Sequence, residues 1–173
     1  MMLDIQHIAK TFNPGTITEK TALHDLSLHL APGDFVTVIG GNGAGKSTLM
    51  NSIAGTFLVD RGTIRIDGED ITRWPEHRRA KYIGRVFQDP MMGTAAGMMI
   101  EENLAIASRR GRRPSLRWSA PKSDREKFRA LLAGLGLGLE DRLESKVGLL
   151  SGGQRQALTL LMATMADPKL LLL

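Results

Sequence analysis

The chain has 173 residues, a formal net charge of +5 and no cysteine. Hydrophobic residues make up 42% of the sequence and charged residues 24%, a composition that predicts a packed globular fold and excludes a disordered or collagen-like chain. The absence of cysteine excludes disulfide bonds and thiolate metal sites, which fits an expected cytoplasmic location. The apolar stretch at 157–166 is too short to cross a bilayer, and Asp4 interrupts the apolar run that an export signal needs.

Part of the positive charge is concentrated in one segment. Its cationic residues are Arg109, Arg110, Arg112, Arg113 and Arg117. Such a segment can contact nucleic acid or an anionic membrane surface, or it can be a solvated loop. A nucleic-acid-binding surface interleaves aromatic side chains regularly, and here only Trp118 lies nearby. We therefore interpret the segment as a solvated loop and expect no nucleic-acid partner.

The beginning of the chain is predicted to be β-structure. Apolar residues alternate with polar ones around residues 3–8 and again at 26–30, and a turn is expected at 13–15. Residues 35–39 are a nearly continuous β-branched and aromatic run, which predicts a strand buried on both faces. A helix is expected from Lys46 to Gly55, with Leu49, Met50 and Ile53 facing inward.

Downstream, the same patterns predict further helices and short strands. The strands are expected at 63–66, 83–87 and 170–173, and the helices at 101–107, 125–135 and from 151 to the residues before Pro168. Ser123 is the expected N-cap of the middle helix. The alternation of strands and helices predicts an α/β fold with a partly parallel sheet, built on an N-terminal antiparallel β part and an inserted helical subdomain.

We expect a single domain over residues 1–173. Its parts are a β part and phosphate-loop core at 1–90, a helical insertion at 91–150, and a final helix and strand at 151–173.

The strongest motif directly follows the predicted strand at 35–39. It satisfies G-x-x-x-x-G-K-[ST] and consists of Gly40, Gly41, Asn42, Gly43, Ala44, Gly45, Lys46 and Ser47. Glycines let backbone N–H groups converge on a phosphate, and the following helix N-terminus adds a positive dipole end. Lys46 supplies a charge to the β- and γ-phosphates, Ser47 a hydroxyl to Mg²⁺, and Thr48 a further phosphate contact.

The alternative interpretation of this motif is a glycine-rich turn without a ligand. As a P-loop, the motif predicts a nucleoside triphosphate and leaves kinase, GTPase, helicase and transporter ATPase open.

A second motif narrows the choice. Leu150, Ser151, Gly152, Gly153 and Gln154 place a serine and two bare amides at a predicted helix start, which is a second anion site built like the first. Here the sequence resembles the ATP-binding-cassette (ABC) family, whose signature is L-S-G-G-Q. In that family the signature of one subunit closes on the nucleotide held by the P-loop of another, so the resemblance implies a head-to-tail dimer. The alternative is a helix with a glycine-rich N-cap.

The resemblance assigns roles to further residues. Gln88 matches the family's glutamine loop, which assists at the γ-phosphate and Mg²⁺ site. Phe12 stands where the family places an aromatic ring under adenine, although a plain core phenylalanine is the alternative. Met91, Met92, Met98 and Met99 follow the glutamine loop, where the family docks its transmembrane subunit; ordinary core filling is the alternative.

The resemblance covers essentially the whole chain and is closest to ATPase subunits of bacterial importers of the aromatic amino-acid (tryptophan or tyrosine) type. It implies a subunit that binds ATP and Mg²⁺ and hydrolyses ATP to drive solute transport. The implied partners are a transmembrane permease subunit, a second ATPase subunit and, indirectly, a solute-binding protein. The implied location is the inner face of the cell membrane. The sequence names neither the solute nor the direction of transport.

One feature departs from the family pattern. Residues 168–173 look like the start of the Walker B strand, which in the family continues into an aspartate and a glutamate that these 173 residues lack. The resemblance thus implies a P-loop NTPase fold incomplete at the C-terminus, with negligible turnover and a marginal or aggregation-prone fold. Two other functions stay open: a non-catalytic nucleotide-binding regulator, and a soluble ABC ATPase acting on nucleic acid or the ribosome.

Overall fold

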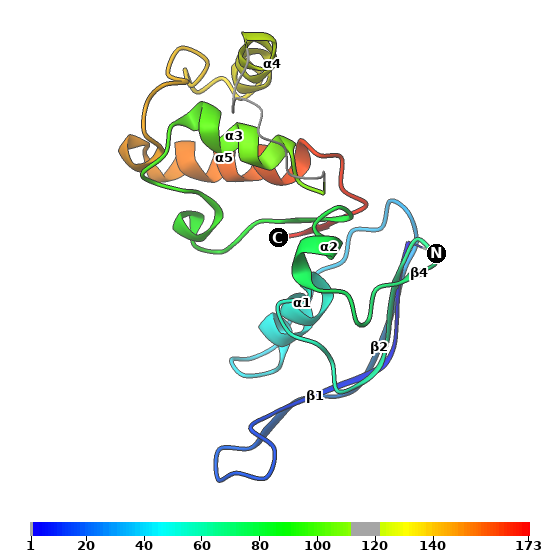
Figure 1. Cartoon of the computed structure of the whole chain (residues 1–173). Helices are drawn as coiled ribbons and strands as arrows, with labels where there is room; N and C mark the ends of the chain where they lie inside the picture. Colours follow the sequence, from blue (N-terminus) through cyan, green and yellow to red (C-terminus); the bar gives the residue numbers. More distant parts are fainter. Residues whose placement is uncertain (1, 112–121) are drawn as a thin grey trace. The chain divides into compact units, whose positions relative to one another are not determined.

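A computed structural model describes residues 2–111 and 122–173. The chain divides into two compact units, Met1–Ile83 and Gly84–Leu173 (Figure 1). The predicted single domain, with internal boundaries after residues 90 and 150, stays a prediction. Arg112, Arg113, Arg117 and Trp118 lie outside the described residues, so the interpretation of their segment as a solvated loop also stays a prediction.

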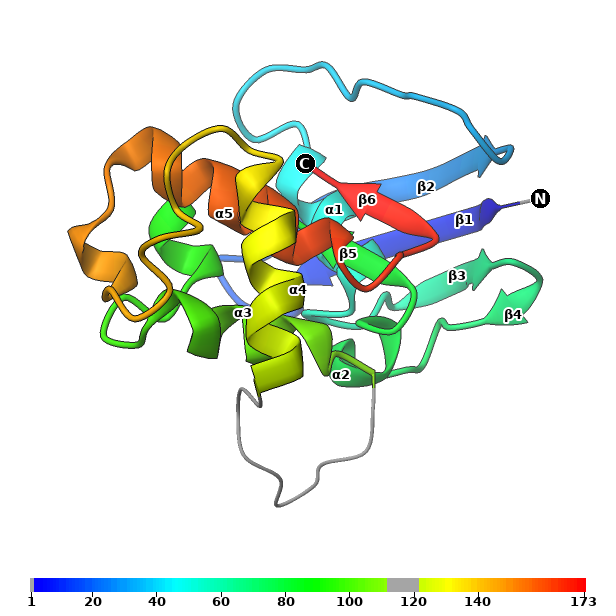
Figure 2. The same cartoon turned by 90° about the horizontal axis from the view of Figure 1, so that it is seen from above.

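The first unit contains a four-stranded antiparallel sheet in the order β2-β1-β3-β4 (Figure 2). Its strands are β1 (Leu3–Phe12), β2 (Lys20–Leu30), β3 (Arg61–Ile66) and β4 (Glu69–Asp70). The two strands predicted at the start of the chain are confirmed and extend further than their apolar patterns. Asp67 and Gly68 join β3 to β4 with φ angles of 53° and 84°, the left-handed pair that a tight hairpin turn requires.

The core of this unit lies on one face of β1 and β3. Leu3, Ile5, Ile64 and Ile66 are all between 0% and 1% exposed. Leu3 stands opposite Ile66 and Ile5 opposite Ile64 in the antiparallel register. Burying each of these side chains contributes about 1.5–3 kcal/mol, so the four cross-strand partners fix the register of the sheet.

Helix α1 (Lys46–Ala54) confirms the helix predicted after the glycine-rich loop. Leu49 and Ile53 are buried, as expected for its inward face. Gly55 ends the helix in the left-handed conformation at φ 86° and donates its N–H to the Asn51 carbonyl. The short helix α2 (Glu76–Arg79) follows β4.

The strand predicted at 35–39 is wrong, since the structure forms no strand there. Phe35 and Ile39 are 87% and 89% exposed, although the pattern predicted burial on both faces. A β-branched run gains stability only when its backbone N–H and C=O groups enter a hydrogen-bonded ladder and its side chains pack on neighbouring strands. Within the described residues, none of the named strands pairs with this segment, and the run connects β2 to the loop without regular secondary structure.

Strands β5 (Ile83–Arg85) and β6 (Leu170–Leu172) form a two-stranded sheet that belongs, except for Ile83, to the second unit. They confirm the two short strands predicted in these regions. The Val86 N–H donates to the Leu172 carbonyl at 2.9 Å. A methyl group placed on Gly84 would lie 2.4 Å from the Ala163 carbonyl oxygen, so only glycine fits beside the end of the last helix.

Three helices form the rest of the second unit: α3 (Ile100–Ser108), α4 (Lys122–Ala133) and α5 (Gly152–Thr164). The 3-10 turns η1 (Pro90–Gly93) and η2 (Val147–Leu149) precede α3 and α5. Leu104, Leu132 and Leu158, from the three helices, are fully buried in one apolar cluster. All three predicted helices are confirmed, but the predicted N-cap at Ser123 is wrong. Helix α4 already includes Lys122, so Ser123 has helical backbone angles instead of the extended ones of an N-cap.

No helix within residues 2–111 and 122–173 is long and apolar enough to span a membrane.

Candidate nucleotide-binding site

The glycine-rich loop enters α1 against strand β2. Gly45 is the N-cap of the helix at φ 86°, and its carbonyl accepts from the Leu49 N–H at 2.8 Å. A methyl group placed on Gly45 would lie 2.5 Å from the carbonyl oxygen of Ala22. Both the backbone angle and the close approach therefore require glycine, and the start of α1 is seated directly on β2.

The loop folds around the ammonium group of Lys46. Lys46 Nζ donates to the Gly40 carbonyl at 2.5 Å and to the Gly41 carbonyl at 2.9 Å. The Ala44 N–H donates to the Gly41 carbonyl at 3.3 Å, which closes the loop. The residues from Gly40 to Ala44 are exposed. The structure thus gathers the predicted loop residues into one open surface with a full positive charge at its centre and a helix N-terminus beneath it.

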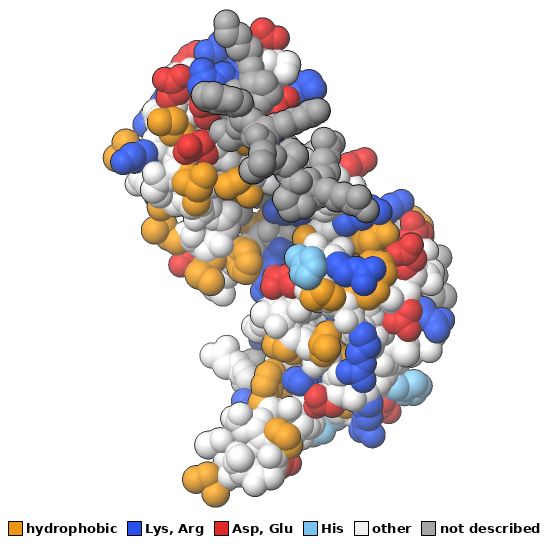
Figure 3. Space-filling model, viewed as in Figure 1, with side chains coloured by type: hydrophobic (Ala, Val, Ile, Leu, Met, Phe, Trp, Pro, Cys, Tyr) orange, Lys and Arg blue, Asp and Glu red, His pale blue; other side chains and the backbone are white. Residues whose placement is uncertain are grey.

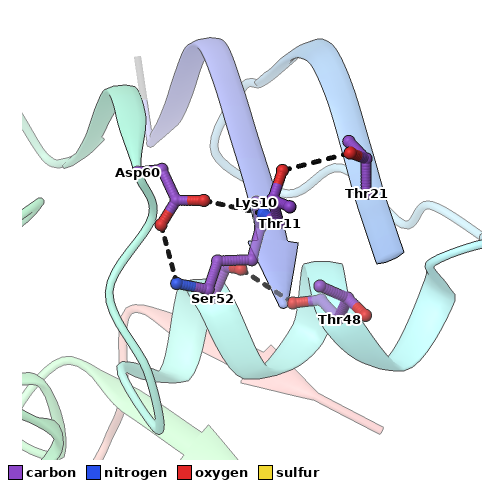
Figure 4. A network of polar contacts seen from close by, with 6 residues as sticks. All are labelled: Lys10, Thr11, Thr21, Thr48, Ser52 and Asp60. Carbon is purple, nitrogen blue, oxygen red and sulfur yellow. Dashed lines mark hydrogen bonds and ion pairs between the residues drawn. The ribbon is translucent and has the colours of Figure 1, made fainter. Parts of the chain in front are cut away.

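Ser47 and Thr48 occupy the first turn of α1. Ser47 is exposed, while Thr48 is half-buried and its carbonyl accepts from Ser52 Oγ at 2.8 Å (Figure 4). Within the described part of the chain, no group of three or more His, Cys, Asp or Glu side chains could hold a metal ion. Mg²⁺ at a triphosphate keeps several waters and takes one or two protein oxygens beside the phosphate oxygens. The Ser47 hydroxyl is the group in this loop suited to it.

Phe12 ends strand β1 with a partly exposed ring. Phe57 meets that ring edge-on, with the centroids 5.2 Å apart and the planes at 87°. Lys10 Nζ lies 5.7 Å from both ring centroids and forms an ion pair with Asp60 at 2.8 Å. The ring is therefore fixed at the strand end but not enclosed. The role of Phe12 as a stacking platform for adenine stays a prediction.

Asp60 anchors the backbone on which this ring stands. Its second carboxylate oxygen accepts from the Thr11 N–H at 2.7 Å, and the Thr11 hydroxyl meets that of Thr21 on β2 at 3.1 Å (Figure 4). The hydrogen bond from Lys10, together with that from Thr11, holds the pKa of Asp60 below its ordinary value.

Sequence reasoning missed Lys10, Phe57 and Asp60 as supports of Phe12. Lys10 lies near the end of β1, whereas Phe57 and Asp60 lie between α1 and β3. The sequence pattern of neither segment indicates that these residues are in contact. The one available signal was an aromatic residue two positions after the helix-ending Gly55.

The signature residues form the predicted helix start in the second unit. Ser151 is the N-cap of α5: its hydroxyl accepts from the Gln154 N–H at 3.3 Å, and Gln154 Oε1 accepts from the Ser151 N–H at 3.2 Å. Gly152 and Gly153 have no left-handed backbone angle, and a methyl group on either would touch nothing within 4 Å. Nothing in the described structure therefore requires glycine at these two positions.

Gln88 follows β5 and is exposed. It belongs to the second unit with the signature, whereas the P-loop belongs to the first unit. The geometry within each unit thus does not bring Gln88 or residues 151–154 together with the loop, and their predicted roles at the nucleotide stay predictions.

The methionines after Gln88 are mostly exposed. Met91, Met92 and Met99 are 51%, 68% and 37% exposed, and Met98 is half-buried. Core filling therefore does not explain Met91 and Met92. On the face drawn in Figure 3, apolar side chains are scattered among charged ones. The candidate docking role of this segment stays a prediction.

A glycine-rich loop that surrounds a lysine ammonium at a helix N-terminus defines a P-loop nucleotide-binding site. Comparison with known proteins identifies the family. The family model described as "ABC transporter" matches residues 23–173. A tyrosine transport ATP-binding protein of Clostridioides difficile is 40% identical over 172 residues, which are 99% of this chain and 68% of the relative. The spermidine/putrescine import ATP-binding protein PotA of Bacteroides thetaiotaomicron is 32% identical; the match covers 99% of this chain and only 34% of that relative.

Solved structures agree with this match. A dimeric ATP-binding cassette in a post-hydrolysis state bound to ADP and Pi aligns with a TM-score of 0.80 at 25% identity, covering 98% of this chain and 72% of that chain. A nucleotide-free cassette from an ABC transporter aligns with a TM-score of 0.75 at 29% identity, covering 98% and 67%. The chain belongs to the ABC transporter family, and its fold is that of the ABC ATPase cassette.

Proposed function

We propose that the chain is the ATP-binding part of an ABC importer. It binds Mg²⁺-ATP at residues 40–48, and in the complete subunit hydrolysis of that ATP drives transport through a transmembrane permease at the inner, cytoplasmic face of the membrane. A solute-binding protein delivers the solute to that permease. The tyrosine transport ATP-binding protein at 40% identity supports an aromatic amino acid as the solute class.

The observation that carries this proposal is the geometry of Lys46. Its ammonium group is held by two carbonyls of an exposed loop that leads directly into the N-terminus of α1. Phosphate oxygens compete well for such a group, because they offer charge-assisted hydrogen bonds in place of neutral ones. The bare amides of the first helical turn and the helix dipole favour the same anion. Ser47 holds the Mg²⁺ that accompanies the triphosphate, and Phe12 supports the adenine ring.

The signature glycines support a head-to-tail dimer. Gly152 and Gly153 have ordinary backbone angles and open space around them, so their own unit does not require glycine. Glycine at such positions lets a phosphate approach the backbone of α5 closely. In the proposed dimer that phosphate belongs to the nucleotide of the second subunit. The reciprocal hydrogen bonds between Ser151 and Gln154 stabilise the N-terminus of α5 for this contact.

We further propose that residues 1–173 form one domain and that Gln88 contacts the Mg²⁺ and γ-phosphate region within it. The exposed Met91 and Met92 stand next to Gln88 in the sequence and suit an adaptable contact with the permease.

A phosphate-release assay tests the hydrolysis part of this proposal, and phosphate release that does not depend on Lys46 would contradict it. If the chain instead lowers the activity of an intact relative when titrated into it, the alternative of a non-catalytic regulator gains support.

Calorimetric titration of ATP in the presence of Mg²⁺ tests the binding proposal. Lys46→Ala removes a charge-assisted contact worth about 1.5–3 kcal/mol, so the Kd rises about ten- to a hundredfold. Lys81→Ala removes the same charge from a side chain that lies over the Tyr82 ring, far along the sequence from the loop, and leaves the Kd unchanged. Equal affinities for the native chain and Lys46→Ala would contradict the proposal.

A further inference from the structure

The hairpin of β1 and β2 places a lysine opposite the aromatic ring at the candidate site. In its antiparallel register, Phe12 is the Cα partner of Lys20. Directly opposite residues of an antiparallel pair project on the same side of the sheet. The Lys20 side chain therefore starts beside Phe12.

The far end of the same side chain reaches the phosphate loop. A methyl group placed on Gly43 would lie 3.6 Å from Lys20 Nζ. Gly43 has a φ of 82° and carries no side chain, so the ammonium group lies next to bare loop backbone. Lys20 thus spans the distance from the aromatic ring to the middle of the loop.

The charge of Lys20 is available to a ligand. Lys10, on the neighbouring strand, is neutralised by Asp60 at 2.8 Å, and Lys46 is engaged by loop carbonyls. No ion pair to Lys20 occurs among the residues that the structure describes, and its side chain is exposed. The adjacent Glu19 instead accepts from the Gly15 N–H at 2.6 Å. An unpaired ammonium beside a loop of converging amides raises the positive potential where an anion would lie.

We propose that Lys20 is a second phosphate-binding cation of this site and that it contacts the phosphate nearest the ribose. This inference rests on the proposed ATP binding at residues 40–48. In a nucleotide the ribose and first phosphate connect the base to the rest of the tail. A side chain that begins beside the Phe12 ring and ends beside Gly43 runs along that connection, whereas Lys46 lies at the helix end of the loop. Lys20 lies outside the loop motif, at the start of β2.

Calorimetric titrations with ADP and ATP test this role, with competition by adenosine as the phosphate-free probe. Lys20→Gln raises the Kd for both nucleotides by the same factor, about fivefold, as expected for loss of one exposed charged contact. It leaves adenosine affinity unchanged and weakens the salt dependence of ADP binding. Lys20→Arg restores most of the affinity because it keeps the charge. Lys81→Gln, an equal loss of charge elsewhere in the same unit, has no effect.

The outcomes separate this inference from the proposed function. If the native chain binds no ATP, the proposed function fails. If it binds ATP and Lys20→Gln binds equally well, the role of Lys20 alone is refuted. An equal loss of adenosine affinity would also overturn it, because Lys20 would then act on the base or ribose. Thermal unfolding of each variant, expected to match the native chain, confirms that the exposed substitution leaves the fold intact.

Discussion

Arg79 is the most informative single residue for testing how the first unit holds α1. The residue is 1% exposed, and its guanidinium group donates to the carbonyls of Ser52 at 2.6 Å and Ile53 at 2.9 Å. It also donates to the carbonyls of Thr72 at 3.0 Å and Trp74 at 2.9 Å. The first two carbonyls belong to the last turn of α1, whose carbonyls lack helical partners. Arg79 therefore fastens the end of the helix whose beginning carries Lys46.

The expected cost of removing this group follows from these four bonds. Each buried carbonyl left without its donor costs about 1–3 kcal/mol. Burial lowers the pKa of Arg79, with Asp70 opposing the shift, so removal of the charge also relieves a desolvation penalty. We expect Arg79→Met to reduce the free energy of unfolding by about 3–5 kcal/mol, the range seen when a buried charged network is broken.

Urea denaturation followed by circular dichroism measures this change. Arg78→Met is the matched control, because Arg78 is exposed and lies 4.5 Å over the Trp74 ring, a contact worth about 0.5–1 kcal/mol at such sites. Arg79→Lys recovers only part of the loss, since an ammonium group cannot reach four carbonyls arranged around a planar fork. A loss below about 1 kcal/mol for Arg79→Met would refute the reasoning.

Three further predictions concern the loop, the signature and the support of Phe12. Gly45→Ala lowers the free energy of unfolding by about 2 kcal/mol or more, because alanine is strained at a φ of 86° and its methyl group would clash with the Ala22 carbonyl. The same substitution weakens ATP binding. Gly41→Ala is the control: it has open space around it and leaves stability unchanged in the same urea assay. Gly153→Ala leaves the melting temperature unchanged or slightly raised but reduces ATP-dependent dimerisation measured by sedimentation; normal dimerisation would contradict the proposed interface. Because the pKa of Asp60 is lower in the folded chain than in the unfolded chain, its carboxylate stabilises the fold at a pH above the unfolded pKa of about 3.9. This contribution to stability disappears as the pH falls through the pKa of the folded state. Asp60→Asn therefore flattens the acid limb of a stability profile below about pH 4, and an unchanged limb would count against the ion pair.

Local patterns predicted the elements whose determinants are local. The helix start at Ser151 follows from a cap and a glutamine three residues later, and the end of α1 follows from a glycine, Gly55, that adopts the left-handed conformation. The loop around Lys46 needs only its glycines and the helix behind it. These features fold as predicted because neighbours in the sequence supply their hydrogen bonds.

Features that depend on distant partners could not be predicted in this way. The run at 35–39 has every local property of a strand, but a strand also needs a neighbour for its backbone, and no described strand takes that place. No local pattern indicates the burial of Arg79, which is buried because four carbonyls from two other segments converge on it. The position of Lys20 opposite Phe12 depends on the hairpin register, which includes several irregularities.

The most direct test of ATP binding at the loop is to map which residues ATP contacts. Amide chemical shifts of the isotope-labelled protein, followed during titration with Mg²⁺ and ATP, report this residue by residue. We predict that the largest changes in the first unit fall at residues 43–48 and around Phe12, and that Lys46→Ala requires a higher ATP concentration to produce them. Saturable changes elsewhere in the first unit, with residues 43–48 unaffected, would contradict the claim that the loop at the start of α1 binds the phosphates.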